Sequence, residues 1–168
     1  MLKHLTWTAL LLASLTACGQ ETPTEQKALT TAAPATPQAV KGNWPPPKVA
    51  RNFDPEQVTR GKAVYEQYCQ SCHGPGGKGQ PGDWRERGPD GKYPPPPLDD
   101  SAHAWHHPTK ILHRVIKHGS PGGSGNMPAW KDVLSDAQVD DVVVYIKSLW
   151  SDDVYAVWHD IEQRSLEP

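Results

Sequence analysis

The sequence of 168 residues is poor in apolar side chains, with one phenylalanine, two methionines and three cysteines, while proline (18) and glycine (14) are abundant. Only 36% of the residues are hydrophobic. A core built from so few apolar groups would be thin for this length, so we expect a large apolar cofactor to supply part of it. The net charge of -2 and the 21% of charged residues give no indication of a nucleic-acid-binding protein.

The N-terminal segment has no apolar run long enough to span a bilayer, because the run from Leu5 to Leu15 covers only 11 residues. Residues 1–17 are therefore interpreted as a signal peptide. Cys18 follows Leu-Thr-Ala, as in the bacterial lipoprotein box, which predicts that Cys18 is lipidated. An ordinary signal peptide cut nearby is the alternative. Residues 18–50, rich in proline, threonine and alanine, are predicted to form a flexible tether.

The domain expected over residues 51–168 is all-α, because no alternating strand pattern of useful length is present. Glycine- and proline-rich loops separate short stretches with helical spacing of apolar residues. Residues able to cap a helix stand at the start of each stretch. These predicted caps are Asp54 with Pro55 behind it, His107 before Pro108, Ser135 with Gln138, and Ser151.

The stretch "YCQSCHGPGG", residues 68–77, carries the strongest chemical signal. A Cys-x-x-Cys pair is found in redox dithiols, zinc sites and haem attachment sites. A redox dithiol usually follows a strand, whereas a helix is expected here, and zinc would need further ligands. The histidine directly after the second cysteine favours haem c, with thioether bonds from Cys69 and Cys72 and axial ligation by His73.

Met127 is the predicted second axial ligand. The only other methionine, Met1, would leave with the signal peptide. Methionine more often fills gaps in a core, but such a residue is expected within a helical stripe. Met127 lies instead in the glycine-rich stretch "GSGNMPAW". A loop of this kind can cross an open haem face and present a thioether sulfur to the iron.

Other polar and aromatic residues have weaker claims to a functional role. His103, with His106 or His107, is spaced like a pair of metal ligands, although capping and loop hydrogen bonds explain these side chains more simply. Trp84 or Trp105 could donate an indole N–H to a haem propionate, but packing is the commoner role of such residues.

Four stretches in order, "GKAVYEQYCQSCHG", "PPL", "GNMPAW" and "DVVVYIKSLW", resemble the class I c-type cytochromes over residues 54–150. The resemblance implies the cytochrome c fold, in which the first and last helices of the family cross. Gly61 and Tyr65 match one side of that crossing, and Val142 and Tyr145 match the other.

The resemblance also implies that a proline carbonyl accepts a hydrogen bond from the proximal histidine. Pro96 matches this position best, with Pro97 as a close rival. The sequence departs from short members of the family in three ways. The loop from His73 to Pro96 is longer, the stretch "SAHAWHH" is inserted, and a further tryptophan-bearing helix follows the usual last one.

The function implied is one-electron transfer by a monohaem, lipid-anchored protein outside the cytoplasm, on the membrane or in the periplasm. We expect redox proteins as donor and acceptor, no enzymatic activity, no small-molecule substrate and no nucleic-acid partner. A haem sensor or haem enzyme with a labile Met127 is one alternative. A subunit fixed within a larger oxidase or reductase complex is the other.

Overall fold

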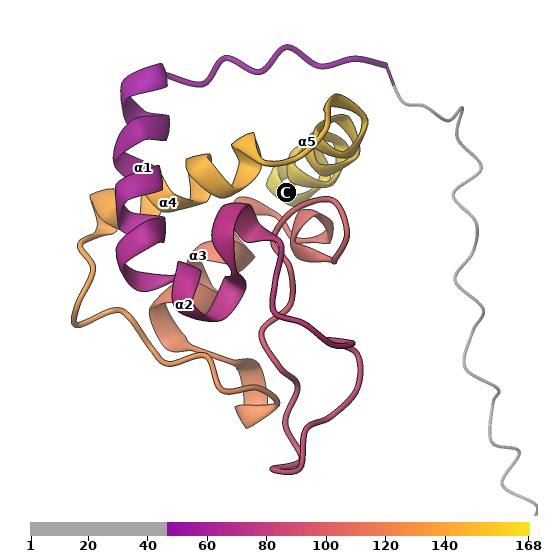
Figure 1. The fold of residues 1–168 in the computed structure, drawn as a ribbon. Helices are drawn as coiled ribbons and strands as arrows, with labels where there is room; N and C mark the ends of the chain where they lie inside the picture. The colour runs from indigo at the N-terminus through magenta and orange to yellow at the C-terminus, as the bar shows by residue number, and fades with distance from the viewer. Residues whose placement is uncertain (1–46) are drawn as a thin grey trace, which may run out of the picture. The chain divides into compact units, whose positions relative to one another are not determined.

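The computed structural model describes residues 47–168 (Figure 1). The predicted signal peptide, the lipidation site at Cys18 and the tether as far as residue 46 lie outside the described residues. The helices are α1 (Pro55–Tyr68), α2 (Gln70–His73), α3 (Thr109–His118), α4 (Asp136–Ser148) and α5 (Asp152–Leu166). Short 3-10 turns occur at Pro75–Gly77, Ala104–His106 and Pro121–Gly123.

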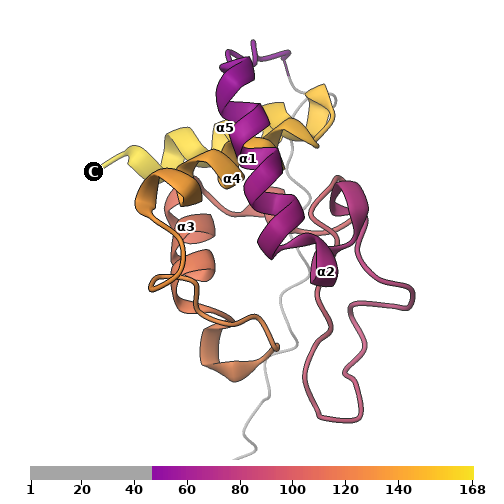
Figure 2. The same cartoon turned by 60° about the vertical axis from the view of Figure 1, so that its left-hand side comes forward.

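No strand forms within residues 47–168, where Tyr93 and Gly125 make one isolated bridge. The all-α class expected from the sequence is thereby confirmed. Within the same residues, no helix is both long and apolar enough to cross a membrane. The loop that follows α2 extends away from the helices in both views of the ribbon (Figures 1 and 2).

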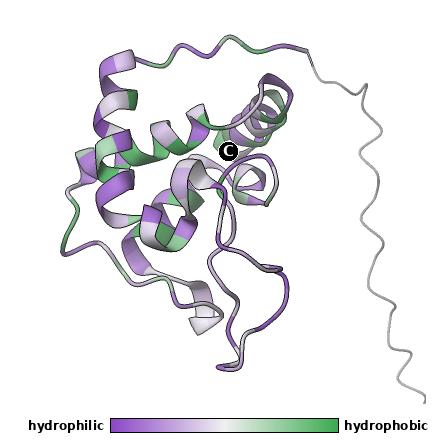
Figure 3. Ribbon diagram, viewed as in Figure 1, coloured by the Kyte–Doolittle hydropathy of each residue, from purple (hydrophilic) through white to green (hydrophobic). Residues whose placement is uncertain are grey.

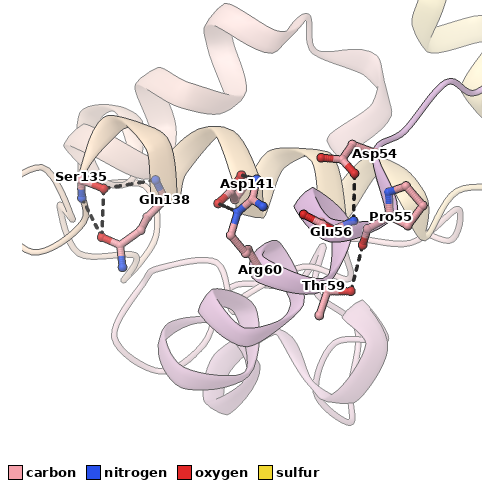
Figure 4. Close-up of polar contacts among 8 residues, drawn as sticks. All are labelled: Asp54, Pro55, Glu56, Thr59, Arg60, Ser135, Gln138 and Asp141. Atoms are coloured by element: carbon pink, nitrogen blue, oxygen red, sulfur yellow. Dashed lines mark hydrogen bonds and ion pairs between the residues drawn. The ribbon is translucent and has the colours of Figure 1, made fainter.

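Helix α1 begins as its sequence predicts. The Asp54 carboxylate caps it by accepting a hydrogen bond of 3.0 Å from the Glu56 amide, and Pro55 occupies the first turn (Figure 4). Proline suits this position because its ring fixes a helical φ and no backbone donor is lost from the helical ladder. The helix ends at Tyr68, directly before Cys69.

Helices α1 and α4 lie across each other (Figures 1 and 2), and Gly61 of α1 lies against Asp141 of α4. A Cβ atom at Gly61 would overlap the backbone carbonyl of Asp141, so only glycine allows the two helices to come this close. The rings of Tyr65 and Tyr145 pack with their centroids 5.1 Å apart. The crossing implied by the family resemblance is therefore present.

Helix α4 supplies much of the core, and Figure 3 shows hydrophobic stretches along it between hydrophilic ones. Val139, Val142 and Val143 are almost completely buried. Its start is fixed by the predicted capping box. The Ser135 hydroxyl accepts from the Gln138 amide at 3.2 Å, and the Gln138 side chain accepts from the Ser135 amide at 3.0 Å (Figure 4).

Helix α5 is the additional C-terminal helix expected from the sequence, and Ser151 caps it through the Val154 amide. Its buried aromatic residue Trp158 packs against Trp150 and Tyr155. Tyr155 also meets Phe53, in the segment that leads into α1, edge to face. Helix α5 therefore joins the domain through aromatic packing on its inner side.

The predicted cap of α3 is wrong. The residue in the N-cap position is Pro108, not His107, and no side chain at that position caps the helix. His107 instead lines a cavity and its ring packs near the ring of His103. The first turn of α3 obtains its hydrogen-bond partner from a distant part of the chain, as shown below.

Candidate haem-binding site

The cysteine–histidine motif occupies the short helix α2. The amides of Cys72 and His73 donate to the Cys69 carbonyl at 3.1 and 2.8 Å. Because residues three and four apart share one face of a helix, the three side chains are presented together. The two thiols are not joined in a disulfide. Burial raises the pKa of the Cys69 thiol to about 11, which is opposite to the lowered pKa of a reactive redox dithiol.

The His73 ring is buried, with 8% of the residue exposed. Its Nδ1 lies 2.8 Å from the Pro96 carbonyl oxygen. A carbonyl only accepts hydrogen bonds, so Nδ1 carries the proton and Nε2 keeps a free lone pair. Burial also lowers the pKa of His73, which favours the neutral imidazole required of a metal ligand. The bond is made to Pro96 and not to its rival Pro97.

The loop that carries Pro96 is held by hydrogen bonds to the glycine-rich turn after the motif. The Leu98 amide donates to the Gly77 carbonyl at 2.6 Å, and the Trp150 indole N–H donates to the Leu98 carbonyl at 2.9 Å. On the other side, the Tyr65 hydroxyl donates to the Gly74 carbonyl at 2.6 Å. These bonds connect the loop that carries Pro96, and the turn after the motif, to the region where α1 and α4 cross.

Met127 lies in the loop between α3 and α4 and is half-buried. Its amide donates to the Ser120 hydroxyl at 3.1 Å, and its carbonyl accepts from the Ser120 amide, also at 3.1 Å. The neighbouring Asn126 donates to the Asp90 carboxylate at 2.7 Å. The methionine loop is thus attached both to the end of α3 and to the long loop after α2.

One cavity of about 610 Å³ brings these residues together. Cys69, Cys72, His73 and Met127 all line it. Its volume lies within the range of cofactor sites in proteins. Apolar side chains make up most of the remaining wall, and α3 contributes four of them: Ile111, Leu112, Val115 and Ile116. The sequence showed this stripe on α3 but gave no sign that it faces a cofactor and not protein.

The cavity also has one group of side chains able to bind carboxylates. Arg85, His103 and His107 line it, and no Lys or other Arg does so among the described residues. The Trp84 ring stacks on His103 with centroids 4.9 Å apart, and the Arg85 guanidinium lies 4.4 Å from the Trp84 centroid. The His103 Nδ1 is buried and has no hydrogen-bond partner within residues 47–168.

These features fit a haem. Its apolar ring requires an apolar cavity, its two propionates require cations or donors, and its vinyl groups and iron require the cysteines, His73 and a second ligand. Arg85 and its neighbours were not singled out as a cluster by sequence reasoning. They come from separate loop positions, and no spacing in the sequence indicates that they meet.

The remaining candidates lie as follows. Trp84 lines the cavity, whereas the Trp105 indole N–H donates to the Asp100 carbonyl at 3.3 Å and is therefore already engaged. His106 is exposed and packs on Trp105. Within residues 47–168, no three side chains of histidine, cysteine, aspartate or glutamate assemble as a metal site.

The all-α fold and the haem attachment motif at the wall of an apolar cavity define a cytochrome c-type domain. The chain belongs to the family described as cytochrome c oxidase, cbb3-type, subunit III, which matches residues 56–146. This match runs from the first turn of α1 to the last turn of α4 and includes the whole cavity. The family supports haem c as the cofactor and haem-based electron transfer as the activity.

Curated relatives agree with this assignment. The chain is 30% identical over 99 residues to the cbb3-type cytochrome c oxidase subunit CcoP of Azospirillum brasilense, covering 59% of this chain and 30% of that protein. It is 31% identical over 94 residues to the cbb3-type subunit FixP of Azorhizobium caulinodans, covering 53% and 28%. The chain thus spans less than a third of the length of these relatives.

Proposed function

We propose that this chain is a monohaem electron carrier in which Cys69 and Cys72 hold the haem covalently and His73 and Met127 are the axial ligands. The observation that carries the proposal is that one and the same cavity is lined by all four side chains. One haem is proposed because the 168 residues contain one Cys-x-x-Cys-His motif. When bound, the haem supplies a metal centre that gains and loses one electron.

The protein residues would prepare this centre for outer-sphere transfer. The His73 Nδ1–H bonded to Pro96 fixes the ring so that Nε2 serves as the ligand. The thioether of Met127 is a soft ligand that favours the reduced state and raises the reduction potential. The apolar wall excludes water, which keeps charge changes at the centre in a low-dielectric environment. With His73 and Met127 both serving as ligands, the iron would have no position open to a substrate, so the proposed function is electron transfer without enzymatic activity.

We further propose that Cys18 is lipidated and that residues 18–50 tether the domain to a membrane surface outside the cytoplasm. The lipoprotein-like sequence supports this proposal. The tether would let one domain meet a redox donor and a redox acceptor in turn at high local concentration. The test is metabolic labelling with radioactive palmitate. We expect the wild-type protein to incorporate the label and Cys18→Ser not to incorporate it.

The ligand set is tested on protein produced in a host with cytochrome c assembly machinery. We expect a mass increase of one haem and a low-spin spectrum whose methionine-to-iron(III) charge-transfer band disappears in Met127→Ala. The reduced wild-type protein should bind carbon monoxide slowly, and Met127→Ala should bind it rapidly. A colourless wild-type protein refutes the proposal. Rapid carbon monoxide binding by the wild type favours a haem sensor or haem enzyme instead.

A second candidate function is a subunit of an oxidase complex, and the family match is the observation that favours it. The relatives are named as subunits of cbb3-type cytochrome c oxidases. Purification from native membranes in mild detergent separates the two candidates. A free carrier should elute as a monomer that exchanges electrons with soluble partners, whereas a fixed subunit should co-purify at constant stoichiometry with an oxidase.

A further inference from the structure

Helix α3 forms a wall of the cavity but lacks a cap of its own. Its N-cap residue, Pro108, has no side chain that can accept a hydrogen bond from the first turn. A helix start without a partner would fray, because its first amides lose water without gaining a protein acceptor. For α3 this would loosen Ile111 and Leu112, the cavity-lining residues nearest that end.

A carboxylate from α5 takes the place of the missing cap. The Thr109 amide donates to the Glu162 carboxylate at 2.7 Å. Next to it, the Lys147 ammonium of α4 donates to the Thr109 hydroxyl at 2.8 Å. In return, the Lys110 ammonium donates to the Ser165 carbonyl near the end of α5 at 2.9 Å. Each of the two helices therefore provides a hydrogen-bond partner for an end of the other.

Lys147 ties this cap to the core. The residue is only 7% exposed, and its ammonium lies 4.1 Å from the centroid of the Trp158 ring. Burial lowers its pKa to about 8, while Glu162 and Asp140 act in the opposite direction. Lys147 therefore stays charged at neutral pH and attracts the Glu162 carboxylate that caps α3.

The far end of α3 leads directly to Met127. The Trp130 amide donates to the Ile116 carbonyl at 3.1 Å, so the methionine loop pairs with the last turns of α3. Ser120, two residues after the helix, exchanges two hydrogen bonds with the Met127 backbone. A rigid α3 connects the Glu162 cap at one end to the methionine loop at the other.

We propose that Glu162, supported by Lys147, is a positioning residue for the haem: by capping α3 from α5, it holds the Met127 loop in the place from which the thioether serves as ligand. The inference rests on the proposed ligation by Met127 and deepens it. Among the described residues, none from α5 lines the cavity. Glu162 lies on the added helix α5, beyond the family match at 56–146, whereas Lys147 lies in the last turn of α4.

The test compares Glu162→Ala with Asp160→Ala in the haem-loaded protein. Asp160 is an exposed carboxylate on the same helix and pairs with Arg164 among residues 47–168, so its loss removes equal charge without removing the cap. In Glu162→Ala we expect hydrogen exchange at the Thr109 amide to rise about tenfold, as for a lost charge-assisted bond. We also expect carbon monoxide binding to the reduced protein to be about tenfold faster and the methionine charge-transfer band to weaken. Asp160→Ala should change each quantity less than twofold.

Glu162→Gln provides a milder variant that retains an acceptor oxygen and similar volume. Because a neutral acceptor forms a weaker bond, we expect changes in the same direction but about threefold in size. Equal behaviour of the Glu162 variants and Asp160→Ala overturns the proposal. Faster Thr109 exchange with an unchanged carbon monoxide rate also overturns it, because the cap would then serve α3 alone. A wild-type protein without the methionine band refutes Met127 ligation itself, which distinguishes failure of the proposed function from failure of this inference.

Discussion

The crossing of α1 and α4 and the cavity wall formed by α3 and the methionine loop are built in opposite ways. The crossing rests on close contact between two helices with caps of their own, at Asp54 and at Ser135. The cavity wall has a helix without a cap of its own, whose first amide donates to Glu162 of α5, and a glycine-rich loop held by hydrogen bonds to Ser120.

The difference indicates that the two regions have different sources of stability. Side chains of α1 and α4 pack on each other, and residues such as Tyr65 and Val139 are completely buried without help from any cofactor. Of the α3 side chains that line the cavity, Ile116 is buried in the core, whereas Ile111, Leu112 and Val115 are only partly buried. We therefore expect changes at the crossing to lower the free energy of unfolding, and changes at the wall to act first on ligation.

Gly61→Val should have the largest effect on the free energy of unfolding, because Gly61 lies where α1 and α4 contact each other. A side chain at Gly61 meets the Asp141 carbonyl and the Tyr145 Cβ, and neither backbone can yield without separating the helices. We expect the free energy of unfolding to fall by about 3 kcal/mol or more, the upper range for overpacking. Urea unfolding followed by circular dichroism measures it.

Ala63→Val is the matched control for this substitution. It places the same β-branched side chain in α1, but at an exposed position. We expect it to cost less than about 1 kcal/mol, as for an ordinary change of helix propensity. Similar losses in the two variants would mean that close contact at Gly61 does not hold the helices together.

The next largest effect is the pH dependence of the free energy of unfolding that arises from Lys147. This residue belongs to both regions, because it lies in α4 and donates a hydrogen bond to Thr109 of α3. Burial lowers its folded-state pKa to about 8 from an ordinary value of 10.5. Between these values the unfolded chain binds more protons than the folded one, so the free energy of unfolding rises with pH. From about pH 7 to about pH 9.5 we expect a gain of about 2 kcal/mol from this group.

Lys147→Met isolates this contribution, because methionine fills a similar volume and does not titrate. Urea unfolding of both proteins at the two pH values gives the comparison, in which other titrating groups cancel. We expect the wild type to gain stability relative to Lys147→Met as the pH rises. A constant difference between the two proteins would show that the buried ammonium does not lose its proton in this range.

Much of the helical structure around the α1–α4 crossing was predictable, because the residues that determine where each helix starts lie next to it in the sequence. Asp54 with Pro55, the Ser135 capping box and Ser151 each act within one turn of their own helix, and all three predictions are confirmed. The glycine at the crossing was predicted through the family resemblance. The motif at Cys69–His73 indicated haem from five consecutive residues, and its ligand set stays a prediction.

The cavity wall was less predictable because its contacts are distant in sequence. His107 was expected to cap α3 because it stands next to the helix, but the acceptor is Glu162, 53 residues beyond Thr109. Arg85 and His103 meet in one cavity although they lie on separate loops. No periodicity or local motif encodes such contacts; they arise from how the loops fold around the space for the cofactor.

A pair of serine substitutions provides the smallest and most selective comparison. Ser135→Ala removes the cap of α4 and should lower the free energy of unfolding by about 1 kcal/mol, with no change in carbon monoxide binding. Ser120→Ala removes the acceptor of the Met127 amide. It should cost no more than about 1 kcal/mol in unfolding, yet accelerate carbon monoxide binding to the reduced protein severalfold, since the methionine loop loses an anchor.

Each serine variant serves as the control for the other, because both lose one hydroxyl that accepts a backbone hydrogen bond. Urea unfolding and stopped-flow carbon monoxide binding are measured on the same two loaded proteins. If Ser135→Ala also accelerates carbon monoxide binding, the α4 cap and the methionine loop are coupled, and the crossing and the wall form one cooperative unit. If neither rate changes, the Ser120 bond does not control Met127, and the loop is held by its other contacts, such as those of Trp130 with Ile116 and of Asn126 with Asp90.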